Sequence, residues 1–313
     1  MCYGSRPHTH QIPFTTFNHC DIPFSGDHCS VFLDAELAIL NFFERPVFCH
    51  TEVLAGSIDP RNSKATYEMS PYLAELIGMM ILVLLGDGVC ANVSLNKTFG
   101  QNTGWLVITT GWAMAVTVAV YMTSVHSGAH LNPAVTIGLA AIGEFETSQV
   151  GGYLLAQLTG AILGATLVWL TYLPHWKETN DPDAIRSCFC NTPAIANVPA
   201  NLLTEIIGTF VLVLGIVTIL RPDNMIPGTG FKEGFQPCVV GITVWAVGLS
   251  LGGATGYAIN PARDLGPRIA HAILPIANKG PSGWNYSWIP VVGPLIGGII
   301  ATFVYQACWP PAG

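Results

Sequence analysis

The chain has 313 residues, of which 50% are hydrophobic and only 10% are charged, and its mean hydropathy is +0.48. Soluble domains carry about 25% charged residues, so this composition excludes an ordinary soluble protein. The formal net charge is −7 with only twelve Lys and Arg residues, which excludes a nucleic-acid-binding protein because phosphate neutralisation needs a cationic face. Residues 1–68 hold four of these basic residues and eight of the nineteen acidic ones, so the rest of the chain is poorer still in charge.

Residues 1–68 differ in character from the rest of the chain. They contain five of the nine His and four of the nine Cys, and they lack both an apolar run long enough to span a membrane and a secretory signal pattern. Neighbouring pairs such as Cys49 and His50 suggest zinc, but their spacing fits no finger or ribbon. We therefore predict a disordered extension, or sequence upstream of the true start, because Met69 opens directly onto the first long apolar run.

Six apolar runs have the length of a membrane-spanning helix, since a hydrocarbon core about 30 Å thick needs about 20 helical residues. They cover residues 71–91, 105–125, 150–173, 201–220, 237–253 and 288–308. Two further apolar segments, 132–143 and 260–272, are too short to cross a bilayer, and each begins with Asn-Pro. These two are predicted to enter the membrane and return on the same side. The stretch 174–199 is polar and rich in Pro, and is predicted to be a loop.

The chain is an internal duplication. The segment Leu-Ala-Glu-Leu-Ile-Gly around Glu75 recurs in the second half as Leu-Thr-Glu-Ile-Ile-Gly around Glu205. The Asn-Pro-Ala that begins at Asn132 recurs at Asn260, at nearly the same offset along the chain. Each copy has three spans, and an odd number of crossings makes the second copy enter from the opposite side. The predicted fold is an all-α membrane protein of six transmembrane helices and two re-entrant half-helices in an inverted tandem repeat. Its two copies are residues 69–194 and 195–313.

Glu75 and Glu205 place carboxylates within apolar runs, which costs several kcal/mol unless hydrogen bonds inside the bundle satisfy them. In a proton-coupled pump they would be relay groups. In a passive fold each would brace the adjacent re-entrant loop by accepting hydrogen bonds from backbone N–H groups. We favour the brace, because the two carboxylates occupy equivalent places in the repeat and do not form one site.

The paired Asn-Pro-Ala motifs are helix starts, because Asn is a good N-cap and Pro suits the first helical position. In an inverted repeat the two helix N-termini face each other near the midplane. Each carries about +0.5 charge, so together they repel a cation by about 4 kcal/mol at 4 Å in an effective dielectric of about 20. A neutral hydroxyl can accept from the Asn amides and donate to backbone carbonyls instead. The motif residues are Asn132, Pro133 and Ala134, and Asn260, Pro261 and Ala262.

The two motif segments carry a family resemblance. Ser-Gly-Ala-His-Leu-Asn-Pro-Ala-Val-Thr at 127–136 and Gly-Tyr-Ala-Ile-Asn-Pro-Ala-Arg-Asp at 256–264 resemble the two signature loops of the aquaporin family, and the likeness extends over residues 69–308. It implies a right-handed six-helix bundle with one pore per subunit, four subunits, cytoplasmic termini, and a place in the plasma membrane or the bacterial inner membrane. It also implies pore-lining carbonyls, at Gly128, Ala129, His130, Gly256 and Tyr257.

The same resemblance implies a selectivity filter of Trp112, Gly248, Tyr257 and Arg263. Water-selective members carry His where Gly248 stands. The volume that Gly248 frees is expected to let the aromatic walls of Trp112 and Tyr257 meet at a corner that holds a carbon backbone, with Arg263 opposite, which is a slot that fits a polyol. Asp264 after Arg263 is similar to the glycerol-conducting branch. A packing role for the two aromatic side chains is the alternative. An Arg in an apolar segment, by contrast, demands a function.

His126 and His130 are four residues apart, but no third ligand lies near them in the sequence, so we predict no metal site. Because histidine titrates near neutral pH, His126 is a hypothetical source of pH-dependent permeability. The resemblance implies no cofactor.

The leading hypothesis is therefore a passive aquaglyceroporin channel for glycerol, small polyols and urea that also conducts water. Three alternatives stay open: a water-only pore, an ion- or proton-coupled transporter, and a structural or adhesion protein with a closed pore. An enzyme is disfavoured because no nucleophile, base and orienting group converge in the sequence.

Overall fold

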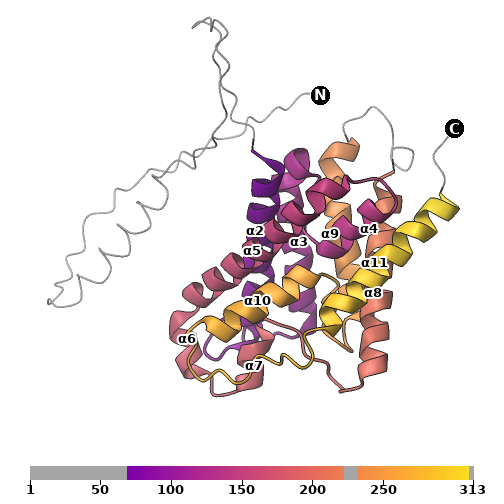
Figure 1. The fold of residues 1–313 in the computed structure, drawn as a ribbon. Coiled ribbons are helices and arrows are strands. Elements are labelled where there is room, and N and C mark those ends of the chain that lie inside the picture. The colour runs from indigo at the N-terminus through magenta and orange to yellow at the C-terminus, as the bar shows by residue number, and fades with distance from the viewer. Residues whose placement is uncertain (1–68, 222–230, 310–313) are drawn as a thin grey trace, which may run out of the picture. The chain divides into compact units, whose positions relative to one another are not determined.

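The computed structural model describes residues 69–221 and 231–309, and these contain helices and no strand (Figure 1). The helices are α2 (Pro71–Ser94), α3 (Trp105–Ser127), α4 (Pro133–Ala141), α5 (Thr147–Thr171), α6 (Leu173–Glu178), α7 (Pro182–Ser187), α8 (Val198–Ile219), α9 (Phe231–Leu251), α10 (Pro261–Ile273) and α11 (Ile289–Cys308). The zinc and disorder hypotheses for residues 1–68 fall outside the described residues.

Six of these helices are long and apolar enough to cross a membrane, and they confirm the six predicted spans. They are α2, α3, α5, α8, α9 and α11. Their ends differ from the predicted ones by only a few residues where both are described. The largest shift is in α9, which begins at Phe231 and not at the predicted residue 237. The helix α8 also begins early, at Val198, because the Asn197 side chain accepts a hydrogen bond from the N–H of Ala200 and caps the helix.

The two short helices begin where the sequence predicted. α4 has 9 residues and α10 has 13, both too short to span a hydrocarbon core. Asn132 and Asn260 are their N-caps, with extended backbone at φ −161° and −155°, and a Pro follows in the first turn of each helix. The half-helix prediction is therefore confirmed.

The two repeats interlock through these half-helices. Within each copy the first span packs on the second and third, so that α2 contacts α3 and α5, and α8 contacts α9 and α11. Each half-helix packs most extensively against the third span of the other copy, so that α4 lies on α11 and α10 lies on α5. Figure 1 shows α10 running beside α5 and α4 beside α11. Each half-helix is therefore packed mainly by the opposite copy.

Close approach between the first and third spans depends on glycine. A Cβ at Gly160 of α5 would overlap the backbone carbonyl of Leu76 in α2, and a Cβ at Gly297 of α11 would overlap that of Ile206 in α8. These contacts are equivalents in the two repeats. Small residues let helix backbones meet in a membrane, where the hydrophobic effect does not drive helices together.

The segment between the third and fourth spans is more ordered than the sequence predicted. Two short helices, α6 and α7, interrupt the expected loop, and the Asp181 side chain caps α7 by accepting from the N–H groups of Asp183 and Ala184. Trp176 and Phe189 are buried, with ring centroids 5.5 Å apart. The polar, Pro-rich composition hid these elements because each is only 6 residues long.

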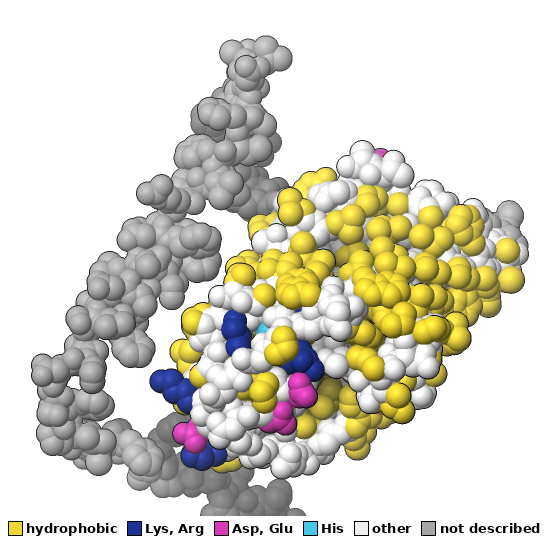
Figure 2. Space-filling view, turned by 60° about the horizontal axis from the view of Figure 1, so that its bottom comes forward, with side chains coloured by type: hydrophobic (Ala, Val, Ile, Leu, Met, Phe, Trp, Pro, Cys, Tyr) yellow, Lys and Arg dark blue, Asp and Glu magenta, His cyan; other side chains and the backbone are white. Residues whose placement is uncertain are grey.

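The surface fits a lipid environment. Figure 2 shows hydrophobic side chains over most of the visible face, while the Lys, Arg, Asp and Glu side chains gather toward one end. Large apolar side chains are exposed on the spans, among them Leu155 at 67% and Leu106 at 59%. Such a continuous apolar surface is unfavourable in water and favourable in a bilayer.

The glycine contacts generate a prediction about stability. Gly160→Ala should lower the unfolding free energy by about 1–3 kcal/mol, because the new Cβ meets the rigid backbone of Leu76 and forces α5 away from α2. Thermal unfolding of the detergent-solubilised protein measures the change. Gly151→Ala is the matched control in the same helix, because a Cβ there meets nothing within 4 Å. Equal melting temperatures for the two variants would contradict the packing argument.

Candidate functional site

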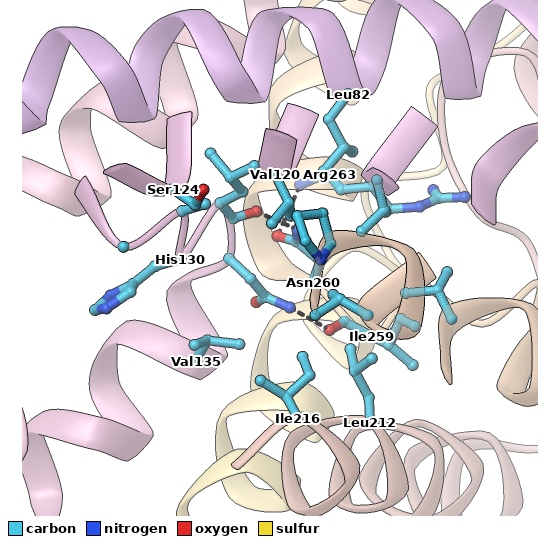
Figure 3. Close-up of a pocket in the computed structure, with 18 of the residues that line it drawn as sticks. Leu82, Val120, Ser124, His130, Val135, Leu212, Ile216, Ile259, Asn260 and Arg263 are labelled. Carbon is cyan, nitrogen blue, oxygen red and sulfur yellow. Dashed lines mark hydrogen bonds between the residues drawn. The ribbon is translucent and has the colours of Figure 1, made fainter. Parts of the chain in front are cut away.

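A cavity of about 280 Å³ runs between the two repeats. Both motif residues Asn132 and Asn260 line it, and so do Trp112, Tyr257 and Arg263. The rest of its wall is mostly apolar, and Figure 3 shows Leu82, Val120 and Leu212 among the lining side chains around Asn260 and Arg263. The structure thus brings both motifs and three of the four predicted filter residues to the same passage.

Two reciprocal hydrogen bonds join the tips of the half-helices. The Nδ2 of Asn132 donates to the carbonyl of Ile259 at 2.8 Å, and the Nδ2 of Asn260 donates to the carbonyl of Leu131 at 2.7 Å (Figure 3). Each Asn Oδ1 meanwhile accepts from the N–H of the Ala two residues later, at 2.9 and 3.1 Å. An amide carries two N–H donors, so each Asn retains one for another acceptor.

The backbone before each Asn is strained in the same way. Ala129 and Leu131 in the first copy, and Tyr257 and Ile259 in the second, all have left-handed φ values between 42° and 49°. Such a conformation costs a non-glycine residue roughly 1–2 kcal/mol. Four strained residues at two equivalent places must be held by their surroundings.

Glu75 and Glu205 contact these strained segments. Glu75 accepts from the N–H groups of His130 and Leu131, at 2.9 and 2.7 Å, and Glu205 accepts from those of Ala258 and Ile259, at 3.0 and 2.9 Å. Glu75 also accepts from the side chains of Ser127 and Gln157, at 2.7 and 2.8 Å. Both carboxyl groups are buried and their hydrogen bonds run to the loop, which is the geometry of a brace.

Trp112, Tyr257 and Arg263 line the same cavity. The guanidinium carbon of Arg263 lies 4.0 Å from the centroid of the Trp112 ring, a cation–π contact. Gly248 does not line the cavity. A Cβ there would lie 2.9 Å from Cζ of Tyr257 and 3.1 Å from Cγ2 of Thr109, so the Tyr257 ring occupies the space that Gly248 leaves. This agrees with the expectation that the volume freed at Gly248 admits an aromatic wall, and the filter role of these residues stays a prediction.

Trp105 also packs against the Tyr257 ring. Its Nε1 donates to the carbonyl of Gly248 at 3.1 Å, and its ring meets that of Tyr257 edge to face at 5.7 Å. The Tyr257 hydroxyl, in contrast, is buried and has no hydrogen-bond partner among the described residues.

Asn191 is a site residue that the sequence reasoning missed. Its side-chain Oδ1 accepts from Nη1 of Arg263 at 2.6 Å, and its Nδ2 donates to the carbonyl of Thr255 at 3.0 Å. Its backbone N–H donates to Asp264 at 2.7 Å, and its carbonyl accepts from Arg268 at 2.9 Å. Asn191, a loop residue, thus fixes the position of the Arg263 guanidinium by a hydrogen bond. Its only sequence signal is its place in the stretch between the third and fourth spans.

Asp264 and Arg268 form a buried ion pair beside this residue, with Nη2 to Oδ1 at 2.7 Å and neither side chain exposed. Arg268 also donates to the carbonyls of Ser282 and Gly283, at 2.7 and 3.0 Å. Asp264 does not line the cavity, so it positions neighbouring groups and does not contact a molecule in the passage.

The remaining predicted residues divide into two groups. Gly128, Ala129 and His130 line the cavity, whereas Gly256 does not. His126 is exposed at the C-terminal end of α3 and is also absent from the lining. Within the part of the chain that the structure describes, no group of three His, Cys, Asp or Glu side chains is arranged to hold a metal ion.

The amino-acid sequence is similar to those of known proteins. The sequence profile of the family described as Major intrinsic protein matches residues 62–305. A probable glycerol uptake facilitator protein of Thermotoga maritima is 58% identical over 238 residues, which are 76% of this chain and 99% of that protein. A glycerol uptake facilitator protein of Bacillus subtilis is 51% identical over 77% of this chain and 85% of its own length.

A solved structure is also similar. The X-ray structure of the aquaglyceroporin from Plasmodium falciparum superposes with a TM-score of 0.68 and 29% sequence identity. The likeness covers 77% of this chain and 96% of that one. It supports the arrangement of spans and half-helices described above.

Asn191→Ala should lower the unfolding free energy by about 2–3 kcal/mol, because it removes a hydrogen bond to a charged group and leaves the Thr255 carbonyl unsatisfied in a buried site. Thermal or chemical unfolding in detergent measures this loss. Asn285→Ala, at an exposed turn, is the control and should change stability by less than about 0.5 kcal/mol. A similar small effect at Asn191 would show that its bonds do not contribute.

Proposed function

We propose that this chain, which belongs to the major intrinsic protein family and is an integral multi-pass membrane protein, is a passive channel for glycerol. Other small neutral polyols, urea and water are proposed to use the same passage. The observation that carries the proposal is the cavity that joins the paired Asn residues to the Trp112, Tyr257 and Arg263 constriction. The names of the Thermotoga maritima and Bacillus subtilis relatives support glycerol as the solute.

The constriction suits a molecule with one apolar edge and one hydroxylated edge. Trp112 and the aliphatic side chains of the cavity can cover a carbon backbone. Arg263 and the second N–H of Asn260 can donate to hydroxyl oxygens. A polyol exchanges its hydrogen bonds with water for these at little net cost, because each intramolecular bond replaces a bond of similar strength.

Ions meet a barrier in the same passage. The N-termini of α4 and α10 approach the cavity with their positive ends, and Arg263 adds a full positive charge, so cations are repelled. A narrow apolar wall cannot replace an ion's hydration shell, so dehydration opposes ions of either sign. Neutral solutes avoid both costs. Each Asn also fixes the direction of a water that accepts from it, which interrupts proton relay along a water file.

A passive mechanism is favoured over a coupled one. Glu75 and Glu205 are the acidic groups that a proton relay would use, but both are occupied by backbone N–H donors of the strained loops. The described cavity also gathers no nucleophile, base and orienting group, which favours a channel over an enzyme.

The family likeness further supports four subunits, cytoplasmic termini and a plasma-membrane or bacterial inner-membrane location.

Gly248→His tests the placement of the constriction. The new side chain must displace the Tyr257 ring toward the passage, so glycerol permeability should fall by at least about tenfold while water permeability falls much less. Stopped-flow light scattering of proteoliposomes in glycerol and in sucrose gradients measures the two rates. Gly253→His is the matched control, because Gly253 is exposed and a Cβ there meets nothing within 4 Å.

Two results would count against the proposal. Wild-type vesicles that take up glycerol no faster than empty vesicles would refute the channel function. Equal losses of glycerol and water permeability in Gly248→His would instead place the selective constriction elsewhere.

A further inference from the structure

The one polar atom of the Trp112 side chain is hydrogen-bonded inside the protein wall. An indole ring carries a single N–H donor and no acceptor. Nε1 of Trp112 donates to Sγ of Cys90 in α2 at 3.3 Å, and this contact is buried. Trp112 lines the cavity, whereas Cys90 does not. The N–H group of the indole is therefore bound to the wall and is not offered to the passage.

Cys90 is the acceptor on which this arrangement depends. It is a free cysteine and is 8% exposed, and among the described residues no other group accepts from Nε1 of Trp112. Sulfur is a weak acceptor, but a buried N–H that loses its acceptor pays the full cost of its own desolvation. Without the sulfur, the indole N–H would therefore turn toward an acceptor in the passage.

A glycine on the same face of α2 brings the indole to this sulfur. Gly86 lies four residues before Cys90, so the two residues are neighbours one turn apart on the helix surface. A Cβ on Gly86 would overlap the six-membered ring of Trp112. The ring thus rests directly on the α2 backbone at Gly86, while its N–H reaches the thiol one turn later.

The position of the indole also affects Arg263. The guanidinium carbon of Arg263 lies 4.0 Å from the centroid of the Trp112 ring. A change in the tilt of the indole would therefore alter both the apolar surface and the charged group that a solute meets at the constriction.

We propose that Cys90 is a positioning residue for the constriction and that it favours glycerol over water by holding the indole N–H of Trp112 away from the passage. The inference rests on the proposed channel function. Glycerol can place its carbon atoms on the indole and its hydroxyl groups on Arg263. An indole N–H released into the passage would hydrogen-bond water and would no longer leave a purely apolar surface for the carbon atoms. Cys90 thus influences specificity without touching the solute.

Cys90→Val tests the proposal, because it removes the acceptor while nearly preserving side-chain volume. The ratio of glycerol to water permeability should fall about fivefold, since the released N–H favours water and the shifted indole covers the carbon backbone less well. Cys90→Ser supplies an oxygen acceptor and should keep the ratio within about twofold of wild type. Stopped-flow light scattering of proteoliposomes in glycerol and in sucrose gradients measures both rates.

Cys238→Val is the matched control in another membrane span. Cys238 Sγ lies 3.2 Å from the hydroxyl of Tyr121, so this variant also removes a sulfur that hydrogen-bonds an aromatic side chain. Cys238 does not line the cavity, and it precedes Gly248 by ten residues of α9, or about 15 Å along the helix. The permeability ratio of this variant should equal that of wild type.

An unchanged permeability ratio in Cys90→Val would overturn the proposal, and so would an equal fall in Cys238→Val. If Cys90→Val does not fold, Cys90→Ala, which only removes atoms, decides by the same criterion.

A second readout tests the hydrogen bond itself, whether or not glycerol passes. Nuclear magnetic resonance of the detergent-solubilised protein with isotope-labelled tryptophan follows exchange of the Trp112 indole hydrogen with solvent, and Trp112→Phe identifies its signal. Exchange should be at least about tenfold faster in Cys90→Val than in wild type and in Cys90→Ser. Equal exchange in all three proteins would overturn the role of Cys90, while failure of wild-type vesicles to take up glycerol would refute only the channel.

Discussion

The passage depends on one reciprocal interaction, in which each half-helix tip donates an amide hydrogen bond to the backbone of the other. These bonds, at 2.8 and 2.7 Å, set the separation of the tips and fix the orientation of both Asn side chains. They reach carbonyls that are correctly placed only because the preceding residues adopt left-handed conformations. Glu75 and Glu205 stabilise those conformations from behind. In each repeat, the buried Glu therefore stabilises the strained loop, and the strained loop places the carbonyl that accepts the Asn amide hydrogen bond from the other repeat.

The constriction inherits its geometry from the same loop. Tyr257 lies three residues before Asn260 and Arg263 three after it, so fixing Asn260 helps to place both side chains in the cavity wall. Their final positions come from elsewhere in the fold. Gly248 admits the Tyr257 ring, and Asn191 draws the Arg263 guanidinium to the wall. The guanidinium then presents to the cavity only those donors that the wall does not use.

Sequence alone predicted the parts whose signal is local or periodic. Spans follow from apolar length, and half-helices from Asn-Pro caps on runs too short to cross. The failures share a cause, which is that they depend on contacts between distant segments. Asn191 lies far from Arg263 in the sequence, and no pattern in its loop predicts the hydrogen bond between the two side chains. Likewise, nothing in the sequence shows that Trp105 and Thr109 lie around the Tyr257 ring beside Gly248.

The two repeats have the same scaffold but different buried charges. This difference distinguishes the residues that the fold needs from those proposed to select solutes. Glu75 and Glu205 occupy equivalent positions and brace equivalent loops, so the fold requires both. The charged groups at the constriction have no such counterparts. When the copies are aligned on Asn132 and Asn260, the positions of Arg263, Asp264 and Arg268 hold Val135, Thr136 and Ala140 in the first copy. A half-helix therefore packs and caps correctly without any of these charges. Since burying charge in a membrane protein is unfavourable, the scaffold does not explain their presence in one copy alone, and this supports the selective role proposed for Arg263.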